Sequence, residues 1–85
     1  MATINFSKLP CFVDIRKQET QEVDIHYDFS NAMYMRGQGV AMGALAMKIY
    51  NEETEYNDNE CDIILSFAKS LSPIVYDSIL AVIHK

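Results

Sequence analysis

The side chains with the greatest capacity for chemistry lie together in the segment NEETEYNDNECD, residues 51–62. Six of these twelve residues are acidic and none is basic. Calcium-binding loops carry oxygen ligands at alternate positions, a glycine at position six and a glutamate at position twelve. Counted from Asp58, acids stand at positions one, three and five, but position six is Ile63 and position twelve is Lys69. The segment therefore does not match an EF-hand loop, and we predict no metal site.

Two other roles for this acidic segment stay open. In the first, a helix begins near Asp58, and Asn57 or Asp58 caps its free backbone N–H groups. Acids in its first turn would face the positive end of the helix dipole, each contributing about 0.3–1 kcal/mol. In the second, the carboxylates imitate phosphates, and the protein inhibits an enzyme that binds nucleic acid. The residues predicted to contact a partner protein are Glu52, Glu53, Glu55, Tyr56 and Asp58.

The segment RGQGVAMG, residues 36–43, contains all three glycines of the chain. Its G-x-G-x-x-x-G spacing differs from the dinucleotide pattern G-x-G-x-x-G, and it has no Gly-Lys-Ser/Thr of a P-loop. It nevertheless precedes an apolar helical stretch, and backbone N–H groups at a helix start can bind an anion. One interpretation is a helix–helix turn with a small-residue packing face. The other is a site for a small anionic ligand or nucleotide at Arg36, Gly37, Gln38 and Gly39.

Residues suited to general acid–base or nucleophilic catalysis are few. Of the two histidines, His26 lies on the polar side of a predicted strand, and His84 is one residue from the end of the sequence, where a helix frays. Neither Cys11 nor Cys61 has a histidine nearby in the sequence to activate its thiol. Closely spaced Cys/His pairs, which zinc requires, are absent. We therefore predict a protein that is not an enzyme and that needs no cofactor.

Charge is distributed unevenly along the chain. The net charge is −5: residues 1–50 carry five acids and five bases, whereas residues 51–85 carry seven acids and two bases. Such a chain repels nucleic acid and anionic membrane surfaces. No window approaches the roughly 18 apolar residues of a membrane span, and residues 1–6 lack the features of a signal peptide. We predict a cytoplasmic protein with free thiols and with no direct nucleic-acid or membrane partner.

The elements that must position these residues begin with two strands. Residues 21–27 alternate strictly, with Val23, Ile25 and Tyr27 on one side, which is the pattern of a half-buried strand. Residues 11–16 alternate in part, and residues 17–20 are polar and short enough for a hairpin loop. A two-stranded hairpin is barely stable alone in water, so it must pack on helices or on another subunit.

The period changes to that of helices from Asp28 onward. Asp28 or Ser30 can cap a helix that ends at Gly37. Further helices are predicted over residues 40–50, apolar nearly all round and therefore expected at a buried centre, and over residues 58–71. Ser72 and Pro73 are a cap and a first-turn proline that begin the last helix. The prediction is a single α+β domain over residues 1–85, with an N-terminal antiparallel β-hairpin followed by a bundle of three to four short helices.

The size of the chain bears on its function. A chain of 85 residues buries only about 60–65% of its unfolded surface, yet 49% of these residues are hydrophobic. Part of the apolar surface is therefore expected in a subunit interface. Our leading expectation is a non-enzymatic, homo-oligomeric interaction module that contacts an unidentified protein through the hairpin and the acidic helix start. In size and in the run LAMKIYNEETEYN the chain is similar to small proteins of bacterial prophages and conjugative elements, which implies no particular activity.

Overall fold

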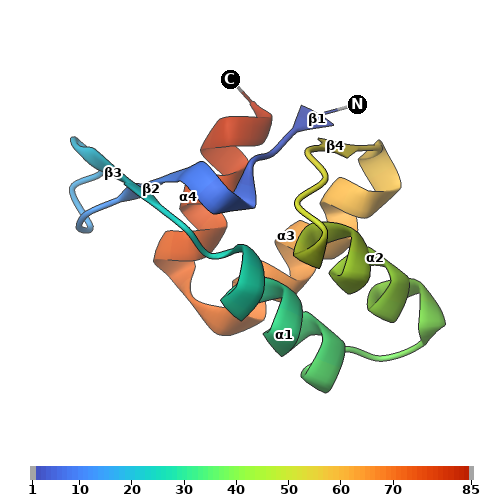
Figure 1. Ribbon diagram of the computed structural model, residues 1–85. Helices are drawn as coiled ribbons and strands as arrows, with labels where there is room; N and C mark the ends of the chain where they lie inside the picture. The colour runs from blue at the N-terminus through green and yellow to red at the C-terminus, as the bar shows by residue number, and fades with distance from the viewer. Residues whose placement is uncertain (1, 85) are drawn as a thin grey trace.

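The computed structural model describes residues 2–84 and has the predicted α+β architecture, with an N-terminal antiparallel hairpin followed by four helices (Figure 1). The strands are short and pair as two separate two-stranded sheets, β1 with β4 and β2 with β3. Helix α1 packs against α2, and α3 packs against α4. In chain order the elements are β1 (Ala2–Thr3), a 3-10 helix (Phe6–Lys8), β2 (Leu9–Phe12), β3 (Thr20–Val23), α1 (His26–Arg36), α2 (Val40–Tyr50), β4 (Glu55–Tyr56), α3 (Asp58–Leu71) and α4 (Pro73–Ile83).

The hairpin is confirmed, but its second strand is shorter than predicted. Leu9 pairs with Val23, and Phe12 pairs with Thr20. The alternation of residues 21–27 predicted a strand through Tyr27, whereas α1 already begins at His26. The cause is Asp24, whose carboxylate accepts a hydrogen bond from the backbone N–H of His26 at 3.2 Å. This bond satisfies a free N–H at the helix start, and the helix begins two residues before Asp28, the first of the two predicted caps.

The residues before the hairpin form a short strand, β1, and a 3-10 helix. Strand β1 pairs antiparallel with β4, with Ala2 opposite Tyr56. The backbone N–H of Ile4 continues this connection by donating to the carbonyl of Thr54 at 2.8 Å. Ile4 and Phe6 are both fully or almost fully buried. The start of the chain is therefore part of the core and holds the α2–α3 connection in place.

The core lies where the first segment, β2 and all four helices meet. The rings of Phe6 and Phe29 stack with centroids 5.1 Å apart, and Phe29 meets Phe67 edge-on at 5.6 Å. Aromatic pairs at such distances add to the stability that comes from burial alone. The aliphatic residues that are completely buried around them are Ile4, Leu9, Ile49, Ile64 and Ile79.

Helices α2 and α3 have the predicted bounds, but the predicted burial of α2 is wrong. Only Leu45, Ala46 and Ile49 of α2 are buried, whereas Val40 is 90% exposed. The apolar composition of α2 predicted a helix surrounded by others. In Figure 1, α2 lies at the edge of the fold, with α1 and α3 on its inner side. Its outer apolar side is left open, because no element among residues 2–84 covers it.

Helix α2 ends in a turn that contains a strained residue. The N–H groups of Glu52 and Glu53 donate to the carbonyls of Ile49 and Lys48, the bonding pattern of a Schellman motif. This motif requires a residue in the left-handed conformation, which is normally glycine. Here Glu52 adopts that conformation, with φ of 62°.

Glu52→Gly is therefore expected to raise the free energy of unfolding by about 1 kcal/mol, because glycine adopts this conformation without strain. Urea denaturation would measure the change. Glu53→Gly is the matched control, since it removes the same charge from a residue without positive φ and should destabilise through the added freedom of the unfolded chain. An unchanged or lower stability for Glu52→Gly would contradict this account.

Candidate functional site

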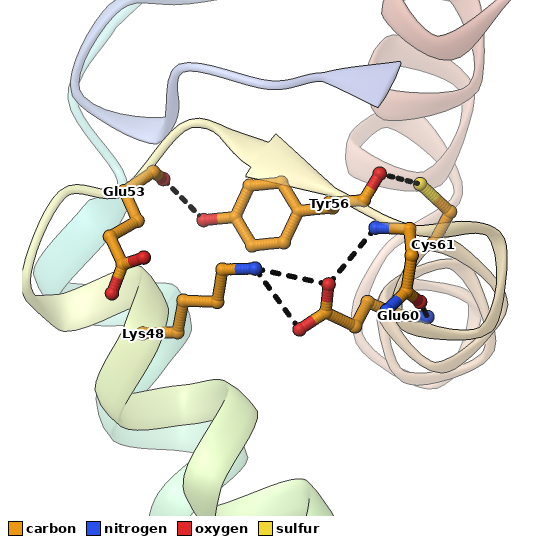
Figure 2. Close-up of polar contacts among 6 residues, drawn as sticks. Lys48, Glu53, Tyr56, Glu60 and Cys61 are labelled. Atoms are coloured by element: carbon orange, nitrogen blue, oxygen red, sulfur yellow. Dashed lines mark hydrogen bonds and ion pairs between the residues drawn. The ribbon is translucent and has the colours of Figure 1, made fainter. Parts of the chain in front are cut away.

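Part of the acidic segment forms the start of α3, as one of the two open interpretations predicted. The side chain of Asn57 accepts from the backbone N–H of Glu60 at 2.8 Å, and the Glu60 carboxylate accepts from the backbone N–H of Asn57 at 2.9 Å. These reciprocal bonds are a capping box. The Glu60 carboxylate also accepts from Nζ of Lys48 at 3.0 Å (Figure 2). The Asn57 N–H, aided by Lys48, holds the pKa of Glu60 below its usual range.

Tyr56 lies outside any contact surface, although it was predicted to meet a partner. Its side chain is completely buried, and its hydroxyl donates to the backbone carbonyl of Glu53 at 2.5 Å (Figure 2). Nζ of Lys48 lies 4.8 Å from the centre of its ring. Burial, with the nearby charge of Glu53, raises the pKa of the phenol. Tyr56 therefore anchors the α2–α3 connection to the core.

The remaining predicted contact residues of this segment are exposed. Glu52, Glu53 and Glu55 line a shallow hollow together with Thr3 and Thr54. The hydroxyl of Ser7 donates to the Glu52 carboxylate at 2.6 Å. Asp58 is also exposed and lies in the first turn of α3. Across residues 2–84, no three His, Cys, Asp or Glu side chains are grouped closely enough to hold a metal ion.

The glycine-rich segment does not form one cradle. Arg36, Gly37 and Gln38 line a hollow with side chains of α2 and α3, whereas Gly39 lines a different hollow on the outer side of α2. The backbone N–H of Gly37 donates to the carbonyl of Met33 at 2.8 Å, so it closes α1 and is not free for an anion. Gly37 also cannot be replaced easily, because an added Cβ would clash with that carbonyl and with Met42.

The histidine and cysteine side chains are placed without a nucleophile–base pair in the described structure. Nδ1 of His26 lies 2.5 Å from Oδ1 of Asp24, and His26 donates because an ionised carboxylate can only accept. The thiols of Cys11 and Cys61 are both free, and burial raises the pKa of each. A raised pKa keeps a thiol protonated at neutral pH, which makes it a weak nucleophile.

The Asp24–His26 pair predicts a pH dependence. The hydrogen bond to Asp24 raises the pKa of His26 above the ordinary value of 6.5. The protonated form is thus favoured by folding, so this stabilisation is complete below pH 6.5 and is lost as the pH rises through the raised pKa of His26. NMR titration of the imidazole should show this raised pKa, and Asp24→Asn should bring it back towards 6.5. A midpoint for His26 that does not change in Asp24→Asn would disprove the assignment.

An uncharged apolar surface with two hollows lies where α1 and α2 run side by side. We call it the α1–α2 face. Two hollows mark it: one of about 220 Å³ between the two helices, and one of about 640 Å³ along the outer side of α2. They share Tyr34 and Met47, and no residue that lines either hollow is charged at neutral pH. The α1–α2 face comprises Tyr27, Tyr34, Val40, Gly43, Ala44, Met47 and Tyr50.

The α1–α2 face differs in charge from the other hollows, because each of the others is lined by charged side chains. The hollow beside α3 contains Arg36, and the hollow beside β1 contains three glutamates. The hollow between the hairpin tip and α4 contains Asp14, Lys17 and Asp77. Sequence reasoning missed the α1–α2 face because it assigned α2 to a buried centre. The sequence does contain a signal for this face, because uncharged residues recur along α2 at helical spacing. They are Val40, Gly43, Ala44, Met47 and Tyr50.

No family model, curated protein or solved structure matches this chain. In addition, no helix among residues 2–84 is both long enough and apolar enough to cross a membrane. A function must therefore be argued from the geometry of the chain itself.

Proposed function

We propose that this protein is a non-enzymatic protein-interaction module whose contact surface is the α1–α2 face. The supporting observation is that large apolar side chains are exposed there in one uncharged area, with Val40 90% and Met47 47% exposed. Contiguous apolar surface of this kind is typical of sites that contact another protein. Tyrosine and methionine are also enriched at such interfaces, while charged residues are depleted from their centres.

The cysteine and histidine side chains do not form a nucleophile–base pair among residues 2–84. Both thiols are held in their protonated form, and His26 is engaged by Asp24 at the start of α1. General bases and nucleophiles act as pairs within hydrogen-bond reach of each other. In residues 2–84 neither cysteine has a hydrogen bond to a histidine: Cys11 has Ser78 as its side-chain partner, and the Cys61 thiol donates to the carbonyl of Tyr56.

The α1–α2 face differs from the contact surface that the sequence predicted. The predicted surface combined the hairpin with the acidic helix start. Two of the acidic segment's residues serve the fold: Glu60 caps α3 and Tyr56 is buried. An acidic inhibitor of a nucleic-acid enzyme ranks lower, because only Glu52, Glu53 and Glu55 of the exposed acids share one hollow, whereas a nucleic-acid mimic needs carboxylates spread over a large face. A ligand site around Arg36 also ranks lower, because Gly39 lines a different hollow from Arg36 and Gly37, and the N–H of Gly37 is already bonded within α1.

Methionine oxidation tests whether the α1–α2 face is covered. Met47 lies on the face, whereas Met35, 71% exposed on α1, lines neither of its hollows and is an internal control. The protein would be treated with hydrogen peroxide in expressing cells and, separately, after purification and dilution, with each sulfoxide quantified by tandem mass spectrometry. We expect Met47 to be protected relative to Met35 in cells. Equal oxidation of the two methionines in cells would overturn the proposed function.

A further inference from the structure

We propose that the α1–α2 face is covered by a second copy of this chain, with the two α2 helices packed antiparallel across a two-fold axis near Gly43 and Ala44. This inference rests on the proposed function and names its partner. Three features support it: the lack of charge on the face, the small residues at its centre, and the opposite charges at the two ends of α2.

The lack of charge fits self-association. A two-fold axis places one surface against an identical surface, so a charge near the axis meets its own copy. The chain carries a net charge of −5, and most of its surface would therefore repel a second copy. The two hollows of the α1–α2 face are lined without a charged side chain. This part of the described surface can thus meet itself without like-charge repulsion.

The centre of α2 allows a second helix to approach closely. Gly43 and Ala44 lie on its outer side, between Val40 one turn before and Met47 one turn after. Small residues reduce the distance at which two helices can pack. With the axis between Gly43 and Ala44, Val40 of one copy packs beside Met47 of the other, since the two positions are equally far from the axis. The open hollow beside Val40 and Met47 is then filled by the second copy's side chains.

The charges beyond the ends of α2 favour the antiparallel direction. Arg36 precedes the N-terminus of α2, and Glu52 and Glu53 follow its C-terminus. All three are exposed. In an antiparallel pair, Arg36 of each copy lies towards the glutamates of the other, and the helix dipoles are opposed. A parallel pair would instead place the four glutamates together.

Cysteine cross-linking tests this arrangement. Ala44→Cys places a thiol beside the axis, where two α-carbons can approach within the roughly 4.4–6.8 Å that a disulfide spans. Ile15→Cys is the matched control, because residue 15 is 89% exposed at the hairpin tip, away from the face. Under mild oxidation we expect Ala44→Cys to form a covalent dimer about tenfold faster than Ile15→Cys. The unaltered chain measures any contribution from Cys11 and Cys61.

Sedimentation of the unaltered chain gives an independent result. A dimer of the 9.7 kDa chain together with fast Ala44→Cys cross-linking supports the inference. A monomer at every concentration, or cross-linking of Ala44→Cys no faster than that of Ile15→Cys, overturns it. If Met47 is nevertheless protected in cells, the proposed function stands with a different partner. If Met47 is oxidised as fast as Met35, the proposed function fails as well.

Discussion

Tyr56→Ala is expected to lower the free energy of unfolding by about 3–5 kcal/mol, the usual loss when a large buried aromatic side chain is removed. Tyr56 is completely buried and meets the ring of Phe6 edge-on at 5.9 Å. It also closes the turn through its hydrogen bond to the carbonyl of Glu53. Because small domains have a total stability of only about 5–15 kcal/mol, this one change should leave the chain close to unfolding.

Two further variants separate the contribution of the Tyr56 hydroxyl from that of its ring and supply an exposed control. Tyr56→Phe keeps the ring and removes the hydroxyl, so it should cost about 1–3 kcal/mol, the range for a buried acceptor left without its donor. Ile15→Ala, at an exposed position, should change stability by less than about 0.5 kcal/mol. Urea denaturation followed by circular dichroism would measure all three. A loss in Tyr56→Ala no greater than that in Ile15→Ala would show that Tyr56 is not in the core.

Ala44→Glu is expected to weaken self-association by about 100-fold or more. Near a two-fold axis the substitution places two carboxylates close together in an apolar contact, and such like-charge juxtaposition costs several kcal/mol. A 100-fold change in the dissociation constant corresponds to about 2.7 kcal/mol. Ala44 is exposed in the single chain, and glutamate is a good helix former, so the fold itself should be retained.

The control for this prediction is Ile15→Glu, which adds the same charge at the exposed hairpin tip. Sedimentation equilibrium would give the dissociation constant of each variant, and circular dichroism would confirm that each remains folded. We expect Ile15→Glu to associate as the unaltered chain does. Equal dissociation constants for Ala44→Glu and Ile15→Glu would mean that association, if present, uses another surface.

Where local signals were strong, the sequence predicted the fold well. The bounds of α2 and α3 agree with the predicted residues 40–50 and 58–71. For α3 the reason is physical: its apolar residues recur at helical spacing, and Asn57 with Glu60 forms a capping box that fixes the first turn. Pro73 likewise fixed the beginning of α4, although the side chain of Ser72 makes no capping bond.

Other features depended on contacts that no local pattern contains. The alternation that suggested a strand through Tyr27 was interrupted by the bond from the N–H of His26 to Asp24. The burial of Ile4 and Phe6 depends on residues roughly fifty positions later, through the pairing of β1 with β4. Sequence periodicity cannot reveal such a pairing between two-residue strands, because two residues are too few to show a period.

The candidate site was predicted only in part for the same reason. The composition of α2 showed that it is apolar, but not which side would be covered. Met47 and Ala46 are neighbours in sequence, yet one is exposed and the other buried, and this difference depends on how α2 packs in the folded chain. The expectation that some apolar surface would remain for a subunit interface came from chain length alone. The sequence predicted a partner-contact surface at the hairpin and the acidic helix start, whereas we propose the α1–α2 face.

The most direct test of the α1–α2 face is a set of two-dimensional NMR spectra of the unaltered protein recorded over a series of concentrations. The backbone amide signals of Gly43, Ala44, Met47 and their neighbours on α1 should shift or broaden as the concentration rises, while those of the hairpin tip stay constant. Concentration-dependent changes confined to the hairpin or to the acidic residues, with none on α1 and α2, would contradict the account.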